Sequence, residues 1–332
     1  MRIAIVTDAW LPQVNGVVRT LQALTSSLTA KGDEILIIAP HEFTSIPCPS
    51  YPEIRLALLP NKGIKQKLDA FRAEAIHIAT EGPLGLAARK YCIKNKLRFT
   101  TAYHTRFPEY VHARTRIPLS WSYAWIRRFH NASNCVMTAT DSLRKDLTKR
   151  GMKNLGVWTR GIDTELFQPK HEDFLDLPRP IAMYVGRVAI EKNIEAYLEL
   201  DIPGSKVVIG DGPQLAKFKR KYPDVHFLGK KEGSELARHY ATADVFVFPS
   251  LTDTFGLVLL EALACGVPVA AYPVCGPLDV IGNAPVGSLN SDLKKAITTA
   301  LTCNRALCRE YAMSYSWEAS VNQFRNNLTK AA

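Results

Sequence analysis

The chain has 332 residues, 47% of them hydrophobic, and a formal net charge of +11 at pH 7. The length predicts about two domains, and the apolar fraction excludes disordered and collagen-like chains. Residues 1–165 hold 24 Lys and Arg against 13 Asp and Glu, whereas residues 166–332 hold 18 of each. The excess positive charge of the first half would attract an anionic partner, either nucleic acid or lipid headgroups, although a soluble protein can also simply be basic.

The seven cysteines are scattered without a Cys-x-x-Cys pair, and their odd number argues against a disulfide framework. We therefore expect reduced thiols in a cytosolic protein. The opening MRIAIVTDAW predicts a strand rather than a signal peptide, because its apolar run is short and Asp8 follows directly. No apolar run is long enough to span a membrane.

In chain order, apolar runs predict strands and 3.6-residue periodicity predicts helices. The first half gives strands at 2–7, 34–39, 54–59, 75–79, 99–103, 135–139 and 155–158, and helices at 17–30, 61–73, 83–94 and 142–149. A polar linker is expected over 170–179. The second half gives strands at 181–185, 207–210, 225–228, 245–248 and 267–271, and helices at 234–242, 256–264, 291–301, 304–312 and 317–329. This alternation predicts an α/β protein of two Rossmann-like domains facing an interdomain cleft.

Two loops of the first half have positions suited to ligand binding. Gly16 stands just before a predicted helix, where a backbone can approach a phosphate closely, although Asn15 could equally serve as a plain helix cap. The dinucleotide motif GxGxxG is absent. His104 follows a predicted strand, at the sheet edge where ligands bind in open α/β folds, but a lone histidine is more often structural.

Residues 110–131 interleave aromatic side chains with arginines. Such a pattern suits a membrane interface, and it also suits a helix packed on the domain with its arginines reaching solvent. We expect packing for some of the aromatics and headgroup contact for some of the arginines. The residues are Arg114, Arg116, Trp121, Tyr123, Trp125, Arg127 and Arg128.

In the second half, Arg187 and Lys192 follow a predicted strand and flank a predicted helix start. A guanidinium fork and an ammonium can converge on a diphosphate. The loop from Gly210 can bring backbone close to a nucleotide, or be a simple turn. Gly229 and Lys230 follow the next strand and would form one wall of a pocket for the base of the nucleotide.

A further loop and helix start carry two carboxylates. Asp253 lies in the loop after a predicted buried strand, and Glu261 lies two turns into the helix that Gly256 opens. The amides of Phe255, Gly256 and Leu257 lie at the helix N-terminus, which favours phosphate. Acids and amides together suggest a pocket for a sugar, its diphosphate and a ribose. Alternatively, Asp253 is an ordinary loop acid and Glu261 a solvated helix residue.

At these positions the chain resembles the retaining glycosyltransferases of family 4, which have the GT-B architecture. Their usual pattern is Glu, seven residues, Glu, with Phe-Gly after the first acid. Asp253 replaces the first Glu here, one methylene shorter, whereas Phe255, Gly256 and Glu261 match. A second family pattern, Gly-Arg followed by Glu-Lys-Asn, matches at 186–193.

The resemblance extends over nearly the whole chain. Gly16 and Val17 match the family's first loop, and residues 102–105, Ala-Tyr-His-Thr, resemble its sulfolipid-synthase branch. The segment TRGIDTELFQP at 159–169 resembles the family's domain junction. Arg160, where other members have Asn, is typical of a branch that includes lipid-directed α-mannosyltransferases.

This resemblance implies a domain organisation and residue roles. An acceptor-binding domain would cover 1–165, a nucleotide-sugar-binding domain 166–312, and a helix crossing back to the first domain 313–332. His104 would contact the donor sugar near the reacting carbon, Asp253 would orient that sugar, and Glu261 would bind the ribose. Arg187 and Lys192 would neutralise the diphosphate in place of a metal, since the sequence has no Asp-x-Asp. The remaining donor-binding candidates are Gly16, Arg160, Gly210, Gly229, Lys230, Phe255, Gly256 and Leu257.

The resulting hypothesis is a retaining hexosyltransferase without a cofactor or metal. It would move mannose or glucose from a GDP- or UDP-linked sugar to a membrane glycolipid, with an anionic membrane surface as a candidate partner of the first domain. A cytoplasmic protein is expected, with peripheral attachment at the inner face of the membrane left open. The alternatives are a soluble or polysaccharide acceptor, a GT-B sugar-nucleotide epimerase, and a basic nucleic-acid-binding protein. We expect no nucleic-acid partner, because the sequence has no such binding motif.

Overall fold

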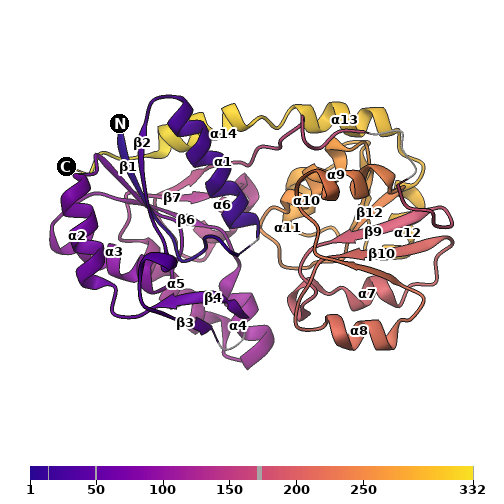
Figure 1. Ribbon diagram of the computed structural model, residues 1–332, viewed down its shortest axis with the longest axis horizontal. Coiled ribbons are helices and arrows are strands. Elements are labelled where there is room, and N and C mark those ends of the chain that lie inside the picture. The colour runs from indigo at the N-terminus through magenta and orange to yellow at the C-terminus, as the bar shows by residue number, and fades with distance from the viewer. Residues whose placement is uncertain (14, 49–50, 170–173, 332) are drawn as a thin grey trace. The chain divides into compact units, whose positions relative to one another are not determined.

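A computed structural model describes residues 1–13, 15–48, 51–169 and 174–331 of the chain. The chain forms two units (Figure 1). Unit 1 comprises Met1–Arg160 and Trp317–Ala332, and unit 2 comprises Gly161–Ser316. The linker expected over 170–179 begins at 170–173, outside the described residues. The functional domain boundaries expected after 165 and 312 stay a proposal.

Unit 1 is built on a six-stranded sheet in the order β2-β1-β5-β6-β7-β8, in which neighbouring strands run parallel. The chain places β2 on one side of β1 and then returns to the other side as β5. A topological switch point therefore lies between the carboxyl ends of β1 and β5, which is where ligands bind in open α/β sheets. The strands are β1 (Arg2–Val6), β2 (Glu34–Ile38), β5 (Ala75–Ile78), β6 (Thr100–Tyr103), β7 (Cys135–Thr138) and β8 (Leu155–Val157).

Helices cover both faces of this sheet because its central strands are apolar on both sides. In β1, Ile3 and Ile5 join the core under α1 and α14, whereas Ala4 and Val6 join the core under α2 and α3. The helix near the C-terminus, α14, thus belongs to unit 1. The helices are α1 (Gly16–Ala30), α2 (Asn61–Phe71), α3 (Pro83–Lys94), α4 (Phe107–Thr115), α5 (Leu119–His130), α6 (Asp141–Lys149) and α14 (Trp317–Asn327), with a 3-10 turn, η1, at Pro40–Glu42.

The strand predicted at 54–59 does not join the parallel sheet, which corrects the expectation from the sequence. It forms β4 (Tyr51–Ala57), which pairs antiparallel with β3 (Ser45–Cys48) in a separate two-stranded sheet. A strand covered on both faces needs a nearly continuous buried run. Arg55 is exposed and donates to the Ser45 carbonyl at 2.6 Å, so this segment stays at the surface.

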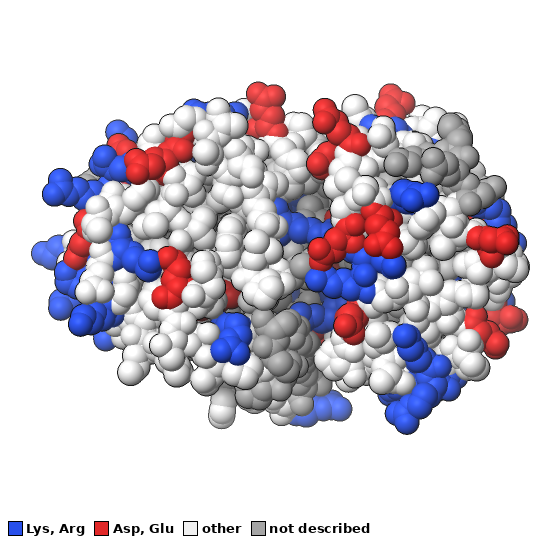
Figure 2. All heavy atoms as spheres, viewed as in Figure 1, with Lys and Arg blue, Asp and Glu red and all other residues white. Residues whose placement is uncertain are grey.

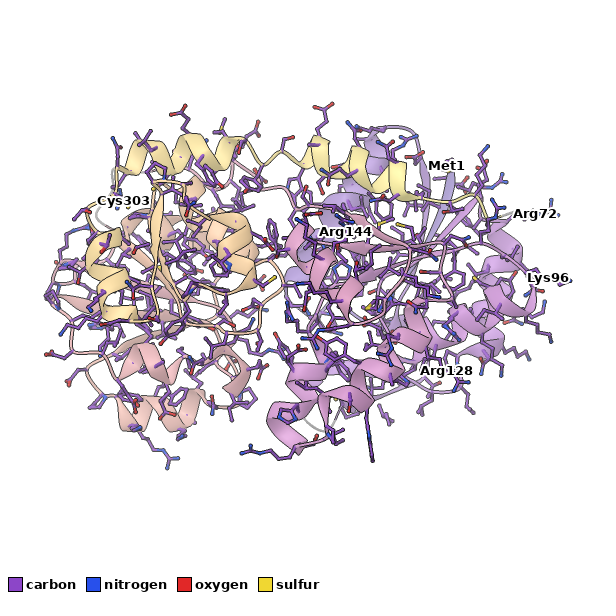
Figure 3. All side chains as sticks on the ribbon, turned by 180° about the vertical axis from the view of Figure 1, so that it is seen from behind. Met1, Arg72, Lys96, Arg128, Arg144 and Cys303 are labelled. Carbon is purple, nitrogen blue, oxygen red and sulfur yellow. The ribbon has the colours of Figure 1, made fainter. Side chains whose placement is uncertain are left out.

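The basic character of unit 1 is visible at its surface. In Figure 2, Lys and Arg side chains gather along the margin of unit 1 formed by α2 and α3. Seen from behind, Arg72, Lys96 and Arg128 point away from the unit (Figure 3), and all three are exposed. None of the described helices is long and apolar enough to cross a membrane.

Unit 2 has the strand order β11-β10-β9-β12-β13-β14, again all parallel. Its switch point lies between β9 and β12, because the chain runs outward through β10 and β11 before it returns to the other side of β9. The strands are β9 (Ile181–Val185), β10 (Ser205–Ile209), β11 (His226–Gly229), β12 (Val245–Phe248), β13 (Val269–Ala271) and β14 (Gly287–Leu289).

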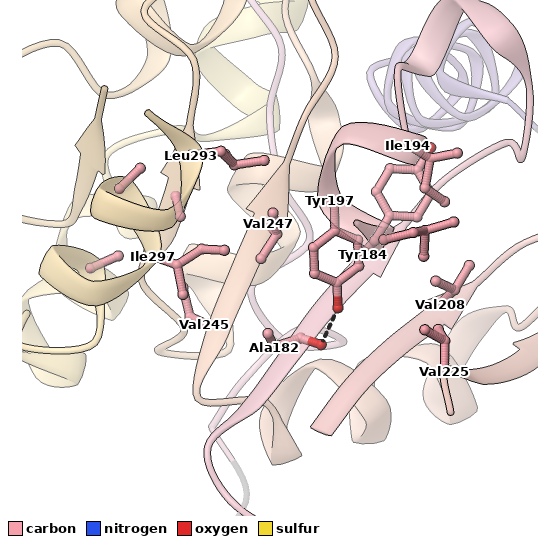
Figure 4. Close-up of a cluster of buried hydrophobic side chains, with 14 of the residues drawn as sticks. Ala182, Tyr184, Ile194, Tyr197, Val208, Val225, Val245, Val247, Leu293 and Ile297 are labelled. Carbon is pink, nitrogen blue, oxygen red and sulfur yellow. Dashed lines mark hydrogen bonds between the residues drawn. The ribbon is translucent and has the colours of Figure 1, made fainter. Parts of the chain in front are cut away.

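The core of unit 2 packs against β9, β10 and β12. Tyr197 is fully buried beside these strands, and its hydroxyl donates to the Ala182 carbonyl at 2.7 Å (Figure 4). This bond satisfies the one polar atom that the aromatic ring brings into the core. The helices are α7 (Glu195–Leu198), α8 (Leu215–Lys221), α9 (Gly233–Thr242), α10 (Leu257–Ala264), α11 (Cys275–Val280), α12 (Leu293–Ala300) and α13 (Arg305–Met313).

Most predicted elements agree with the structure to within two residues at each end. The helix expected to open near Lys192 is instead a 3-10 turn, η2 (Ile190–Lys192), followed by Asn193 with φ 50° and the short helix α7. The stretch 110–131 divides into two helices, because the chain turns at Arg116, which has φ 60°, and Pro118 follows. No pattern in the sequence predicted β3, β14 or α8.

Candidate active site

The two loops that flank the switch point of unit 2 are joined to each other. One follows β9 and contains η2, and the other follows β12. A backbone carbonyl in each loop accepts a hydrogen bond from a side chain of the other loop, and an ion pair also joins the two loops. The contacts are Asn193 Nδ2 to Pro249 O at 3.1 Å, Thr252 Oγ1 to Glu191 O at 3.3 Å, and Lys192 Nζ to Asp253 Oδ1 at 2.5 Å. The two loops therefore form one platform at the carboxyl end of the sheet.

The pair of Lys192 and Asp253 lies partly buried on this platform. Their side chains are 21% and 15% exposed. The second carboxylate oxygen of Asp253, Oδ2, is buried and has no hydrogen-bond partner among the described residues. A buried acceptor without a donor is costly, so this oxygen is suited to accept a hydrogen bond from a bound ligand. The structure thus brings together two predicted site residues that are 61 positions apart.

Helix α10 begins beside this platform with its first amides uncapped. Gly256 precedes the helix at φ +87°, a conformation that favours glycine, and within the described part of the chain no side chain hydrogen-bonds to the helix as its cap. A Cβ at Gly256 would also approach Leu259 Cδ1 to 3.1 Å. The neighbouring Phe255 is buried and Leu257 is half-buried. The helix N-terminus can therefore present amides to an anion.

Glu261 is buried, which excludes its interpretation as a solvated helix residue. Its side chain is 3% exposed, and the Tyr240 hydroxyl of α9 donates to its Oε2 at 2.9 Å. The phenol fixes the orientation of a carboxylate that could otherwise rotate. Sequence reasoning missed Tyr240, because a tyrosine within an amphipathic helix gives no sign of its partner.

The glycine after β10 is required by the fold itself. Gly210 has φ +145°, and a Cβ there would lie 1.8 Å from the Gly186 carbonyl oxygen. Its amide donates to the Gly229 carbonyl at 2.9 Å. Gly210 is therefore needed because the backbones at the ends of neighbouring strands come close together. Contact of Gly210 or Gly229 with a nucleotide stays a prediction.

The two remaining basic candidates of unit 2 differ in their surroundings. Arg187 is half-buried directly after β9, and its carbonyl accepts from the Tyr184 hydroxyl at 2.8 Å. Lys230 is exposed after β11 and forms an ion pair with Glu232 at 2.6 Å. Arg187 thus lies in the switch-point loop, whereas Lys230 lies two strands away in the sheet order.

In unit 1, His104 and Arg160 contact each other although they come from different loops. Arg160 is 5% exposed, and its Nη2 donates to His104 Nδ1 at 3.1 Å. Its Nη1 donates to the Trp158 carbonyl at 2.6 Å, and the guanidinium lies 4.2 Å from the Trp158 ring centroid. Burial lowers the pKa of Arg160 to about 9.

The protonation state of His104 follows from this contact. Burial, together with the adjacent Arg160 charge, lowers the pKa of His104 well below its usual value of 6.5. The imidazole is therefore neutral near pH 7. Because Nδ1 accepts from an arginine that can only donate, the ring proton is on Nε2. His104 is thus prepared to act as a hydrogen-bond donor through Nε2.

The predicted loop before α1 has a satisfied helix cap. The Asn15 side chain accepts from the amides of Val17 and Val18, both at 3.0 Å, as expected for an N-cap. Gly16 is exposed beside it. Two of the amides that a phosphate could use are already bonded. Val14, in the same loop, lies outside the described residues.

The described residues contain no group of three or more His, Cys, Asp or Glu side chains placed to hold a metal ion. The seven cysteines are all free.

Comparisons with known proteins show which family the chain resembles. Residues 14–166 match Glycosyltransferase Family 4, and residues 168–313 match Glycosyl transferases group 1. The chain is 30% identical to a GDP-mannose-dependent alpha-mannosyltransferase of Mycolicibacterium smegmatis, over 87% of this chain and 84% of the relative. It is 29% identical to a sulfoquinovosyl transferase of Arabidopsis thaliana, over 96% of this chain and 71% of the relative. An alpha-monoglucosyldiacylglycerol synthase of Streptococcus pneumoniae is 27% identical, over 98% of this chain and 83% of the relative.

A solved structure shows the same fold. Sucrose-phosphate synthase from Thermosynechococcus elongatus superposes with a TM-score of 0.81 at 20% identity, over 98% of this chain and 97% of that one. The predicted GT-B fold class is thereby confirmed. Full-length similarity, the two matched regions and the shared fold lead to one conclusion: the chain belongs to glycosyltransferase family 4 and is a glycosyltransferase.

Proposed function

We propose that the enzyme transfers a hexose from a GDP- or UDP-linked sugar to a lipid or glycolipid at an anionic membrane surface, with retention at the anomeric carbon. The observation that carries this proposal is the pair of Lys192 and Asp253 at the switch point of unit 2. It places a cation for a diphosphate beside a carboxylate oxygen that lacks a donor among the described residues. The relatives named above use GDP-mannose in one case and make a glycolipid in another, which supports the donor and acceptor classes.

Unit 2 would hold the donor. When the glycosidic bond breaks, negative charge grows on the departing diphosphate. Cations and amides fixed in advance stabilise that charge without reorganisation. Arg187, Lys192 and the uncapped N-terminus of α10 supply such groups. Glu261, held by Tyr240, would accept hydrogen bonds from the ribose hydroxyls.

Asp253 would bind the transferred sugar. Its Oδ1 is occupied by Lys192, so Oδ2 is the oxygen suited to a sugar hydroxyl. The shorter side chain, compared with the Glu of the family pattern, matches this use because Lys192 already fixes it in place. The ammonium between Asp253 and the diphosphate would orient both.

Unit 1 would bind the acceptor and contact the donor sugar through His104. A neutral imidazole with Nε2–H donates to a hydroxyl oxygen without placing a full positive charge near the anomeric carbon. That carbon itself becomes positive in the transition state, so a protonated histidine would oppose the reaction. Arg160 would act through His104 by fixing its tautomer.

No protein base is proposed. The resemblance to the family implies that the departing phosphate accepts the proton of the acceptor hydroxyl on the same face of the sugar. The bond from the anomeric carbon to phosphate oxygen breaks, and a bond to the acceptor oxygen forms on the same side.

The helices α4 and α5 of unit 1 would contact the membrane. Trp121 is 73% exposed and Trp125 41%. They line a hollow of about 240 Å³ with Phe107, Val111, Ile117 and Ser122. Arg116, just after α4, and Arg128, on α5, are exposed, whereas the side chain of Arg114 lies outside the described residues. Exposed tryptophans beside arginines fit the headgroup layer of an anionic bilayer, while Tyr123 is buried and serves packing.

The donor can be identified by thermal shift. Purified protein would be screened against GDP, UDP and ADP and their hexose conjugates, with and without EDTA. Binding to the folded state raises Tm by mass action. A rise with one nucleotide family, unchanged by EDTA, is expected, and no rise with any of them would contradict the proposal.

The acceptor needs a separate assay. Transfer of labelled hexose from that donor would be compared between vesicles containing diacylglycerol or its glycolipids and soluble saccharides. We expect product in the lipid fraction. Faster transfer to a soluble saccharide would overturn the lipid assignment and leave the glycosyltransferase activity intact.

A further inference from the structure

Two carboxylates stand at the switch point of unit 1, and their surroundings differ. Asp8 follows β1 and is 7% exposed. Its oxygens accept from the amides of Leu84 and Gly85, at 2.9 and 3.3 Å, and from the Thr80 hydroxyl at 2.8 Å. Asp8 therefore bonds two amides in the first turn of α3, and three of its roughly four acceptor positions are in use.

The second carboxylate, Glu81, follows β5 and is partly open to solvent. Its side chain is 19% exposed, and its Oε1 lies 3.0 Å from Nε2 of His130, which is fully buried. An ionised carboxylate has room for about four hydrogen bonds on its two oxygens. The contact with His130 uses one of them, so a ligand can be bound by the remainder.

A buried chain of hydrogen bonds fixes the position of this carboxylate. His130 Nδ1 lies 2.9 Å from Thr101 Oγ1, which lies 3.1 Å from Ser133 Oγ. The imidazole of His130 is therefore held on both sides, by Glu81 at Nε2 and by Thr101 at Nδ1. The members of this chain come from β6 and from the end of α5, so Glu81 is tied to the core of unit 1.

The register of the sheet places Glu81 level with His104. Strands β5 and β6 pair with Ile78 opposite Thr101. Glu81 and His104 each come three residues after that pair, just beyond the carboxyl ends of neighbouring strands. The ring of Tyr103, next to His104 in sequence, also lies 6.0 Å from the His130 ring. Glu81 thus occupies the same sheet edge as the proposed sugar contact.

We propose that Glu81 binds the acceptor by accepting a hydrogen bond from one of its hydroxyl groups, and that His130 is the residue that positions it. The ligand class is a polyol, either the sugar of a glycolipid or a glycerol headgroup. This inference rests on the proposed assignment of unit 1 to the acceptor. A carboxylate is suited to this task, because it only accepts hydrogen bonds and bonds to a charged group are stronger than neutral ones.

The test is Glu81→Gln in the full-length protein. Glutamine keeps the shape and one oxygen but removes the charge. We expect kcat/KM for the acceptor to fall about 10- to 100-fold, the usual range for a lost hydrogen bond to a charged group. KM for the donor and the slow hydrolysis of donor in the absence of acceptor should stay unchanged. Glu81→Asp, which retains the charge, should recover part of the loss.

The matched control is Glu74→Gln, at the opposite end of β5. Glu74 accepts from the Arg2 amide at 2.7 Å, far along the strand from the switch point. Its substitution should leave acceptor kinetics unchanged. His130→Gln should weaken acceptor binding in the same direction as Glu81→Gln, and its Tm reports any loss of folding.

Two results would overturn the inference. One is an equal fall of acceptor transfer and donor hydrolysis in Glu81→Gln, which would indicate a donor or folding role. The other is no change in either. Each variant is compared with the wild type on whichever acceptor the wild type uses, so failure of the lipid assignment appears in the wild-type assay and stays distinct from failure of the Glu81 proposal.

Discussion

Both units are six-stranded parallel sheets with a switch point, but their strand orders differ and the chemistry at the two switch points differs as well. In unit 2, the loops beside β9 and β12 present a lysine, an arginine and an uncapped helix N-terminus, which suit an anion. In unit 1, the loops beside β1 and β5 present two carboxylates, and the neighbouring strand ends in a neutral histidine. The same sheet edge can therefore serve a charged diphosphate in one unit and neutral hydroxyls in the other, depending only on the loop side chains.

The largest effect is expected from Lys192→Ala. This variant would remove the lysine that distinguishes the switch point of unit 2 from that of unit 1. It removes a cation at the diphosphate and leaves the partly buried Asp253 without its partner. We expect kcat/KM for the donor to fall roughly 100- to 1000-fold, as for the loss of a preorganised charge-stabilising group. Steady-state kinetics would measure this. The control is Lys221→Ala, which removes an exposed ion pair of the same unit and should change kcat/KM little. Equal losses in both variants would argue against the assignment of Lys192 to the diphosphate.

The second prediction concerns acid sensitivity, which should be marked in unit 1. Burial lowers the pKa of His77 to about 3, and that of His104 is lowered in the same direction. Below pH 6.5 the unfolded chain gains protons that the folded chain cannot take. The free energy of unfolding should therefore fall with decreasing pH between 6.5 and about 3.

Tryptophan fluorescence can isolate this effect, because all five tryptophans belong to unit 1. Urea unfolding would be followed by fluorescence at pH 7.5 and 5.5. A lower midpoint at pH 5.5 is expected, and His77→Gln should reduce the difference. Identical midpoints at the two pH values would show that these histidines are not kept neutral by folding.

The third prediction sharpens the role of Arg160 as the partner of His104. In Arg160→Lys the charge is kept, but an ammonium cannot reproduce the two-pronged contact with His104 and the Trp158 carbonyl. We expect kcat to fall about tenfold with little change in donor KM, since the histidine would lose its fixed tautomer. Arg2→Lys, at the exposed start of β1, is the control. A rise in donor KM with unchanged kcat would instead indicate direct donor binding by Arg160.

The fourth prediction tests the hydrogen bond from Tyr240 that holds the Glu261 carboxylate in place. Tyr240→Phe removes one hydrogen bond to a buried carboxylate and keeps the ring. Donor KM should rise about three- to tenfold, which corresponds to roughly 1 kcal/mol for one such bond. Isothermal titration with the nucleoside diphosphate measures it directly. An unchanged affinity would remove Glu261 from the proposed ribose site.

The smallest effect is expected at the proposed membrane surface. Trp121→Ser should weaken binding to anionic vesicles about threefold or more, because the variant lacks one exposed indole that would insert into the headgroup layer. Turnover of a detergent-dispersed acceptor should not change. Flotation with vesicles measures binding, and Leu59→Ser, an exposed apolar residue outside α4 and α5, is the control. Equal flotation of both variants and the wild type would place the membrane contact elsewhere.

The sequence predicted the elements whose pattern is local. Strands 181–185 and 245–248 were predicted with their observed bounds, since each is an apolar run with a proline at one border. Strand β14, Gly287–Leu289, was missed because three residues give no periodicity and its pairing with β13 depends on the assembled sheet. The Asn15 cap was predictable, because its side chain accepts from amides only two or three residues away.

The candidate site was predictable as residues but not as contacts. The spacing of Asp253 and Glu261 was visible in the sequence, whereas the Tyr240 bond to Glu261 spans 21 positions and the His130 contact with Glu81 spans 49. Such pairs arise from the order of the strands, which no local pattern encodes. Glu81 in particular belongs to no motif, and only the sheet register shows that it lies at the same sheet edge as His104.

The central claim is that the carboxylate paired with Lys192 recognises the transferred sugar. Isothermal titration of the wild type and Asp253→Asn with a nucleoside diphosphate and with its hexose conjugate tests it most directly. The account predicts that the variant binds the free diphosphate at least as tightly as the wild type does, but loses the additional affinity for the conjugate. An equal loss for both ligands, or an unchanged preference for the conjugate, would contradict it.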